Sequence, residues 1–220
     1  MTRWTRWAMT GATLAIVAGL AGCTGDAQEP LPVDTAPVVQ LGAPGEPNRT
    51  LSPEEAASIS SPPYVEADVN FVRDMLHHHS QAIVMTDLVA ENSDDEEVRN
   101  LAERMAIGQT DEMRLMETWL QDRGEPARDP NAKHGEHATD MPGLLTQAEL
   151  DELAAASGPE FDLLFLTFMT KHHQGAVSMV VDLYNANGAQ EVDIDRIARE
   201  IEADQNIEIK RMAEMIAARE

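Results

Sequence analysis

The chain has 220 residues and a formal net charge of −23, with 39 acidic side chains against 16 basic ones. This length accommodates one domain with appended segments, and so acidic a surface excludes nucleic acid as a partner while it attracts cations. The single cysteine, Cys23, excludes an intramolecular disulfide, so the fold depends on packing alone or on packing and a metal ion.

Residues 1–22 have the features of an export signal. Two arginines form a positive n-region, and the apolar run at residues 8–21 is too short for a stable transmembrane helix. The run ends in Leu-Ala-Gly-Cys, which resembles the bacterial lipobox. We therefore expect lipid on Cys23 to anchor the chain to the outer face of the cell membrane. The alternative is an ordinary cleavage site beside which Cys23 is incidental.

Residues 23–63 are predicted to be a disordered linker that holds the folded domain away from the membrane. This segment contains eight of the twelve prolines, interspersed with small and acidic residues and without a helical or strand period. The sequence Ser-Pro-Glu-Glu at residues 52–55 could begin a short helix, which the Pro62-Pro63 pair would end.

Residues 64–220 are predicted to form the folded domain, which consists of helices and contains no strand pattern. A polar loop and a short helix occupy residues 125–158, and Thr146 with Glu149 forms a capping box that opens the short helix. Glycine, proline and asparagine mark the ends of the long helices. The four long helices are expected at about residues 66–91, 94–123, 160–187 and 192–219.

An internal repeat relates the first long helix to the third. Seven residues recur 94 positions later with the same residue types. The two copies are Asp68, Phe71, Met75, His78, His79, Ala82 and Met85, and Asp162, Phe165, Met169, His172, His173, Ala176 and Met179. The second and fourth helices also correspond. Two such hairpins, at about residues 64–124 and 159–220, predict an all-α, antiparallel four-helix bundle, because long helices joined by short loops pack in this way.

The repeated residues share one side of each helix. At 100° per residue they span about 120°, the width of a stripe that faces a core. This construction places His78 and His79 inside the bundle and His77 on the opposite, solvated side. The two repeated phenylalanines are expected in the core. The two repeated aspartates lie near helix starts, where a carboxylate caps the helix or stabilises its dipole.

The other two helices also turn polar residues inward. Gln109 and Glu112 lie on the core side of the second helix, and Gln205 and Glu208 lie on the core side of the fourth. We expect the four imidazoles to converge in one buried pocket together with these side chains. Buried polar groups without a partner cost several kcal/mol each, so something must satisfy them.

Two arrangements could satisfy these groups. In the first, His–Glu and His–Gln hydrogen bonds between neighbouring helices are sufficient. In the second, a metal ion is also bound, and the Glu and Gln side chains orient the imidazoles. The predicted metal ligands are Met75, His78, His79, Met169, His172 and His173.

The ligand types favour copper. Imidazole and thioether are typical ligands of a soft metal, whereas hard ions prefer carboxylate-rich sites. Zinc would leave the methionines unused, and the Glu-x-x-His pairs of a diiron bundle are not in register here. Zinc or iron is therefore less favoured than copper. A second site could form from His134, His137 and Met141, although the same segment is compatible with a plain polar loop.

The sequence contains none of the common catalytic motifs. A catalytic cysteine, a glycine-rich phosphate loop and a nucleophile elbow are all missing from it. Ser80 beside His79 lacks any oxyanion arrangement that would make the two a nucleophile and its base. The chain is therefore predicted not to be an enzyme.

The two histidine segments, residues 75–82 and 169–176, resemble the bacterial family called domain of unknown function 305. Met141-Pro142-Gly143 and Phe161-Asp162 support the resemblance, which extends from about residue 64 to residue 220. It implies a ferritin-like four-helix bundle in an exported protein, often a lipoprotein, and for some members extracytoplasmic copper binding and resistance. The six predicted ligands inherit their role from the same resemblance.

This chain departs from the family pattern at two places. Leu144 replaces the last methionine of the common Met-Pro-Gly-Met, which removes one thioether from the loop. The first copy has Ser80-Gln81 where the second has Gln174-Gly175.

The sequence thus predicts an exported, membrane-anchored lipoprotein that binds copper or a similar soft metal through the duplicated Met-x-x-His-His motifs. Its role would be metal buffering, delivery or resistance outside the cytoplasm, with an unidentified metal-accepting protein as a possible partner. The alternative is a structural or interaction module with a self-satisfied His–Glu polar core. A third possibility is a redox or oxygen-handling enzyme with iron in the bundle.

Overall fold

The computed structural model describes residues 38–41, 45–57, 62–127 and 141–219 of the chain. These residues belong to two units, residues 1–58 and 59–220, which are treated separately. The predicted signal peptide, Cys23, His134 and His137 lie outside the described residues.

The first unit contains secondary structure where a disordered linker without strands was expected. Strands β1 (Val38–Gln40) and β2 (Arg49–Leu51) pair antiparallel, and helix α1 (Pro53–Ala57) follows. The Ser52 hydroxyl accepts a hydrogen bond from the Glu55 amide, and the Glu55 carboxylate accepts one from the Ser52 amide. This local capping box explains the short helix. A strand of three residues is too short to show a recognisable alternation of apolar and polar side chains. The sequence pattern therefore did not predict these two strands.

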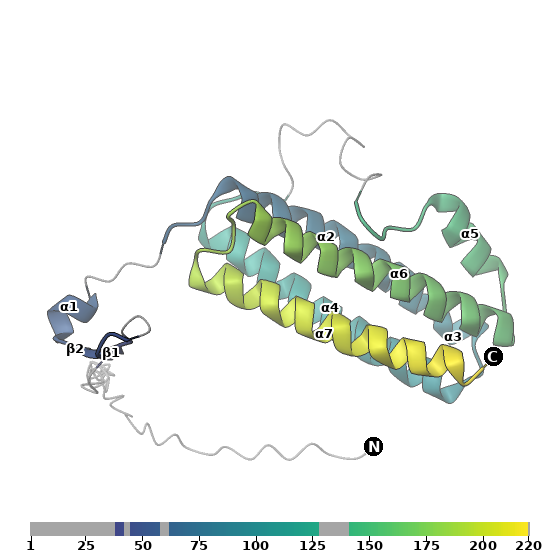
Figure 1. Ribbon diagram of the computed structural model, residues 1–220. Coiled ribbons are helices and arrows are strands. Elements are labelled where there is room, and N and C mark those ends of the chain that lie inside the picture. The colour runs from purple at the N-terminus through teal and green to yellow at the C-terminus, as the bar shows by residue number, and fades with distance from the viewer. Residues whose placement is uncertain (1–37, 42–44, 58–61, 128–140, 220) are drawn as a thin grey trace, which may run out of the picture. The chain divides into compact units, whose positions relative to one another are not determined.

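The second unit contains four long helices, α2, α4, α6 and α7, which pack as a bundle (Figure 1). Helix α2 pairs with α4, α6 pairs with α7, and the two hairpins meet through α2 against α6 and α4 against α7. This arrangement confirms the predicted all-α bundle of two hairpins. None of the described helices is long and apolar enough to span a membrane. The helices are α2 (Glu66–Asp87), α3 (Val89–Asn92), α4 (Glu96–Asp122), α5 (Gln147–Ala155), α6 (Gly158–Asn185) and α7 (Val192–Ala217).

Two helix boundaries differ from the predicted ones. The first predicted helix is interrupted at Leu88, and the Thr86 hydroxyl there donates to the Ile83 carbonyl. Such bonds from threonine to the preceding turn compete with the helix ladder. Helix α6 begins at Gly158, which has φ +62°, and a proline occupies its first turn. The third long helix, expected from about residue 160, therefore begins two residues earlier.

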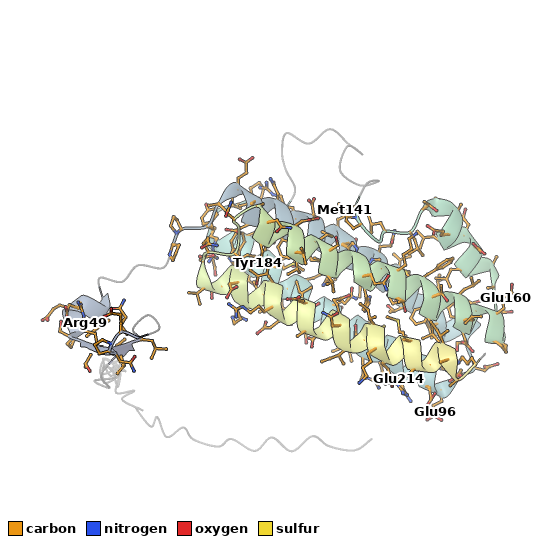
Figure 2. All side chains as sticks on the ribbon, in the orientation of Figure 1. Arg49, Glu96, Met141, Glu160, Tyr184 and Glu214 are labelled. Atoms are coloured by element: carbon orange, nitrogen blue, oxygen red, sulfur yellow. The ribbon has the colours of Figure 1, made fainter. Side chains whose placement is uncertain are left out.

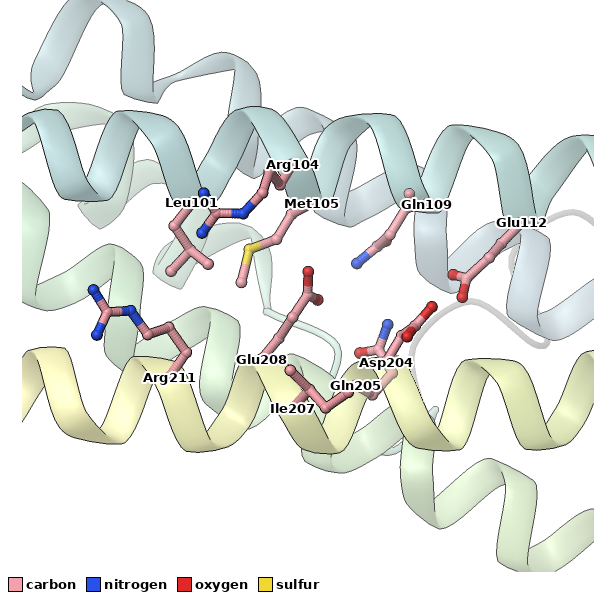
Figure 3. A pocket seen from close by; sticks show the side chains of 11 residues that line it. Leu101, Arg104, Met105, Gln109, Glu112, Asp204, Gln205, Ile207, Glu208 and Arg211 are labelled. Atoms are coloured by element: carbon pink, nitrogen blue, oxygen red, sulfur yellow. The ribbon is translucent and has the colours of Figure 1, made fainter.

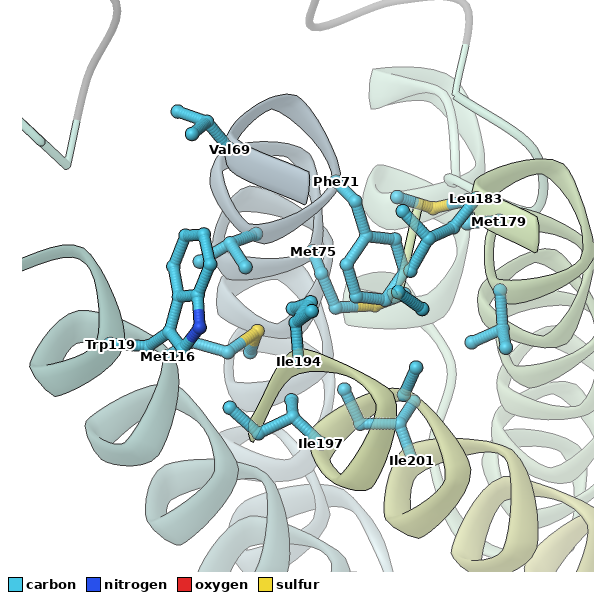
Figure 4. Packing of buried hydrophobic residues seen from close by; sticks show 14 of the residues in the cluster. Val69, Phe71, Met75, Met116, Trp119, Met179, Leu183, Ile194, Ile197 and Ile201 are labelled. Carbon is cyan, nitrogen blue, oxygen red and sulfur yellow. The ribbon is translucent and has the colours of Figure 1, made fainter. Parts of the chain in front are cut away.

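The apolar core forms two clusters at opposite ends of the bundle. One is built around Phe71, Trp119 and Ile194 (Figure 4), and the other around Phe161 and Phe165. On each of the four long helices, the inward polar residues fall between the part that contributes to one cluster and the part that contributes to the other. These inward residues therefore form a polar layer across the middle of the bundle, which consists of His78, His79, Gln109, Glu112, His172, His173, Gln205 and Glu208.

The two repeated aspartates connect each hairpin to the loop of the other. Asp68 accepts hydrogen bonds from the Val65 amide at the start of α2 and from the Ala189 amide in the α6–α7 loop, the latter at 2.6 Å. Asp162 accepts one from the Ser93 hydroxyl in the α3–α4 connection, at 2.5 Å. The expected capping role holds for Asp68, and both aspartates also fix the geometry between the hairpins.

Candidate functional site

All four repeated histidines lie in the polar layer. His78, His79, His172 and His173 are each at most 1% exposed, whereas His77 is exposed. The helical wheel therefore assigned the inward and outward positions correctly. Each neighbouring pair on a helix divides between two environments, because consecutive residues point 100° apart around the helix axis.

His78 and His172 form the inner pair, at the contact between α2 and α6. Their ring centroids lie 3.8 Å apart at an interplanar angle of 40°. The Nε2 atom of His78 lies 3.0 Å from the Pro142 carbonyl oxygen, and that of His172 lies 3.0 Å from the His78 carbonyl oxygen. A carbonyl can only accept, so each Nε2 carries the hydrogen. Each Nδ1 then holds a free lone pair, and neither has a hydrogen-bond partner among the described residues.

Burial keeps the inner pair neutral. It lowers the pKa of His78 to about 3, with the neighbouring His79 as the next cause. The pKa of His172 lies well below its usual value for the same first reason, with His78 as the next cause. Neutral imidazole is the form that binds metal ions, so at neutral pH no proton has to leave these rings before a metal binds.

His79 and His173 form the outer pair, which faces carboxylates. His79 Nε2 lies 2.7 Å from Glu112 on α4, and His173 Nε2 lies 2.6 Å from Glu208 on α7. Each glutamate thus lies within hydrogen-bond distance of one imidazole, and its role behind a metal ligand stays a prediction. The Nδ1 atoms of this pair also lack a partner within the described part of the chain. A carboxylate on the far nitrogen fixes the tautomer of a metal-binding histidine and makes it a stronger ligand.

The four imidazoles do not form a single coordination sphere, contrary to expectation. The rings on one helix are 6.5 Å apart for His78 and His79 and 6.1 Å apart for His172 and His173. Within the described residues, no group of three or more His, Cys, Asp or Glu side chains is arranged to hold a metal ion. The inner pair is in contact, while each outer ring turns towards a different helix. A helical wheel predicts in which direction a side chain points, but it does not predict which neighbouring helix that side chain contacts.

The two methionines of the motifs flank the layer on opposite sides. Met75 belongs to the cluster around Phe71, and Met169 belongs to the cluster around Phe165. Both are fully buried. Each thioether lies one helical turn from its histidine pair, so the two Met-x-x-His-His sets remain the predicted ligands.

The two inward glutamines do not bond to the histidines as the self-satisfied arrangement required. Gln109 is 2% exposed and Gln205 is 1% exposed. Both amide atoms of Gln109 and the amide oxygen of Gln205 have no hydrogen-bond partner in the described structure. Buried amides without partners are costly, so these two side chains suit a polar guest.

The predicted loop before α5 closes the layer on the α2–α6 side, a position that the sequence did not predict. It contains Pro142, whose carbonyl bonds His78, and Leu145, whose backbone is held by the Gln81 side chain at 2.7 and 3.0 Å. A Cβ on Gly175 would come within 2.0 Å of the Pro142 carbonyl oxygen, so only glycine permits this approach. Gln81 and Gly175 occupy equivalent positions in the two repeats but are different residue types. Both contact this loop, Gln81 from α2 and Gly175 from α6.

Met141 begins this loop and is half-buried against the cluster around Phe71 (Figure 2). Its contact is therefore with the apolar core. Because its two histidine partners lie outside the described residues, the possible loop site remains a prediction.

On the opposite side of the layer, a cavity of about 300 Å³ opens between α4 and α7. Figure 3 shows side chains from both helices around it. Its lining comprises Leu101, Arg104, Met105, Gly108, Gln109, Glu112, Asp204, Gln205, Ile207, Glu208 and Arg211. The wheel identified its four inward Gln and Glu residues, but the opening itself depends on the separation of the two helices, which the sequence does not give.

The fold and site define an all-α protein in which two repeated helical hairpins enclose a buried layer of histidine, glutamate and glutamine. The chain belongs to the family described as Domain of unknown function (DUF305), whose sequence model matches residues 68–216.

Solved structures agree with this assignment. A DUF305 protein from Streptomyces coelicolor is 34% identical, with 70% of this chain and 93% of that chain covered and a TM-score of 0.62. A DUF305 fragment from Deinococcus radiodurans is 33% identical over 71% of this chain and 99% of that one, with a TM-score of 0.63.

A third similar structure is CopM in a Cu(II)-bound form. It is 29% identical over 69% of this chain and 96% of that chain, with a TM-score of 0.57. CopM has also been solved in Cu(I)-bound and Ag-bound forms. No curated protein matches the chain.

Proposed function

We propose that this chain binds copper, or a similar soft metal, in its buried histidine layer. The observation that carries the proposal is the set of four buried Nδ1 lone pairs that no described residue engages. Each imidazole already uses Nε2 on a carbonyl or a carboxylate, so the orientation that a metal-binding histidine needs is in place. A buried nitrogen lone pair without a partner lowers the stability of the fold.

The ligand types support a soft ion. Each histidine pair has a fully buried thioether one turn away, Met75 in the first repeat and Met169 in the second. Thioether and imidazole together select copper over calcium or magnesium. CopM, a structural relative, has been solved with Cu(II), Cu(I) and silver, and these are ions that such a donor set favours.

The proposed role is copper buffering or delivery outside the cytoplasm, without catalysis. The Streptomyces coelicolor relative is described as a secreted protein, which agrees with the export signal predicted for residues 1–22. Lipid on Cys23 would hold the domain at the membrane. An unidentified protein would receive the metal.

A competing function is that of a structural module whose polar core is satisfied by His–Glu pairs. The two pairs with Glu112 and Glu208 agree with that idea. The amide oxygens of Gln109 and Gln205, which have no partner in the described structure, do not, because a self-satisfied core would have paired them.

Titration of the full chain with Cu(I) against a competing chelator distinguishes the two functions. We expect binding tighter than micromolar and a rise in thermal stability on loading, because a ligand that binds only the folded state stabilises it. His77→Ala is the matched control, since it removes an exposed histidine beside the site. Binding weaker than micromolar, or unchanged thermal stability, would contradict the proposal.

A further inference from the structure

The two faces of the polar layer differ in access. On the α2–α6 face, the Pro142 carbonyl bonds the inner pair and the Gln81 side chain holds Leu145 by two hydrogen bonds. Gly143 and Gly175 bring the loop and α6 into backbone contact, because a Cβ on either would lie under 3 Å from the backbone of the other segment. A metal ion cannot pass such a contact without moving the loop.

The α4–α7 face is open through the cavity of about 300 Å³. Gln109 and Gln205 line it while being 98% or more buried, and their amide oxygens have no partner in the described structure. Glu112 also lines it, and only one of its two carboxylate oxygens is used, on His79. The second oxygen is buried and unpartnered. This carboxylate therefore connects the cavity to a histidine of the layer.

The second repeat provides the same connection. Glu208 lines the cavity and bonds His173 at 2.6 Å. Figure 3 shows Glu112 projecting from α4 and Glu208 from α7 at the cavity. Both outer histidines thus reach the cavity through a carboxylate.

Three carboxylates, those of Glu112, Asp204 and Glu208, line this opening. Burial raises the pKa of the Asp204 carboxyl, and repulsion from Glu112, Glu208 and Glu200 raises it further. Arg211 forms ion pairs with Glu97 and Glu214, outside the lining, at 3.4 and 3.6 Å. Arg104 also lines the cavity, and its side chain is exposed. The carboxylates of the lining therefore outnumber its arginines. Carboxylates that repel one another around unpartnered amide oxygens form a site that a cation would stabilise.

We infer that the α4–α7 cavity is a cation-binding port, in which oxygen ligands hold an incoming hydrated metal ion before Glu112 and Glu208 pass it to the histidine layer. This inference rests on the proposed function for its direction of transfer. Oxygen ligands suit a hydrated divalent ion, and imidazole and thioether bind the same copper ion more tightly once its water is lost.

Stopped-flow measurement of Cu(II) loading into the full chain tests the port. Asp204→Asn should slow loading by about tenfold at low salt, while stoichiometry and equilibrium affinity stay near wild type. The double variant Gln109→Leu with Gln205→Leu should also slow loading, because it removes the amide oxygens from the cavity. Glu117→Gln is the control, since Glu117 is an exposed acid of α4 that does not line the cavity. Loading slowed no more than in the control would overturn the port and leave copper binding intact.

A second measurement does not depend on copper. Mn(II), a hard ion, should broaden the side-chain amide NMR signals of Gln109 and Gln205 in the wild-type chain before those of glutamines elsewhere, such as Gln174. Selective broadening supports a cation site in the cavity even if the copper titration fails. Uniform broadening across all glutamines contradicts the site.

Discussion

The inner and outer histidine pairs are adjacent in sequence but occupy different environments. The inner rings of His78 and His172 contact each other and bond only backbone carbonyls. The outer rings of His79 and His173 each bond a carboxylate on the partner helix of their own hairpin. A turn of 100° between consecutive residues is enough to produce this division.

The difference shows that the His-His dipeptide of each repeat supplies one histidine to a closed site and one to a site near the cavity. The inner pair lies between the hairpins and is shielded by the loop around Pro142, so it is neutral and closed to solvent. The outer pair lies next to the cavity between α4 and α7 and is connected to it through Glu112 and Glu208. The inner pair should therefore contribute most of the affinity for the metal. The outer pair should contribute some affinity and should also connect the metal site to the cavity.

The largest expected effect comes from removing the inner pair. His78→Ala combined with His172→Ala should abolish metal loading, whereas His77→Ala should leave it unchanged, because the inner rings contact each other and each has an Nδ1 without a partner in the described structure. The measurement is copper stoichiometry after dialysis. His78→Asn with His172→Asn, which leaves a smaller void, controls for loss of folding, which circular dichroism would report. Equal loss of copper in the His77→Ala variant would refute the division into inward and outward faces.

The next largest effect comes from the carboxylates behind the outer pair. Glu112→Gln with Glu208→Gln should weaken copper binding by about 10- to 100-fold, the usual effect of removing a carboxylate that orients a metal-binding histidine. Competition with a Cu(I) chelator measures the affinity. The Glu117→Gln control should match wild type. An unchanged affinity in the double variant would mean that the outer pair does not contribute ligands.

A smaller effect is expected in the pH dependence of stability without metal. Because the pKa of His78 is about 3 in the folded chain and about 6.5 when unfolded, the unfolded state binds more protons between these values. Protonation of this histidine therefore does not reduce the free energy of unfolding above about pH 6.5. Below that pH, it should reduce the free energy of unfolding by about 1.4 kcal/mol per pH unit.

The pKa of His172 is shifted in the same direction, so its contribution adds to the slope. Urea unfolding of the metal-free chain between pH 5 and pH 7 measures this slope, which His172→Asn should reduce and His77→Ala should not. A stability that does not change over this range would show that the inner rings are not neutral and buried.

The smallest predicted effect concerns the loop over the inner pair. Gln81→Ala removes two hydrogen bonds to Leu145 and should lower the free energy of unfolding by about 1–2 kcal/mol. Gln174→Ala, an exposed glutamine on α6, is the control and should change it by less than about 0.5 kcal/mol. If both variants behave alike, the loop does not secure the inner pair.

Sequence reasoning predicted the bundle because its evidence was periodic and duplicated. The stripe from Asp68 to Met85 and its copy placed every repeated histidine correctly, and the wheel also predicted the pairing of inward glutamates with imidazoles. These properties depend on helix geometry alone.

The remaining features depend on contacts between elements that are distant in sequence. The Pro142 carbonyl that bonds His78 comes from a segment 64 residues away, and no periodic signal marks it. The sequence showed that Gln81 and Gly175 differ at equivalent positions of the two repeats. It did not show that both residues contact the loop around Pro142. The open cavity likewise follows from the distance between α4 and α7, which the sequence pattern does not specify.

Copper-edge X-ray absorption of the loaded full chain tests the central claim most directly. If the buried layer binds the metal, the spectrum should contain imidazole nitrogen scattering together with thioether sulfur scattering, and the variant that lacks His78 and His172 should retain too little copper to give this spectrum. A spectrum of oxygen ligands alone, unchanged in that variant, would contradict the account.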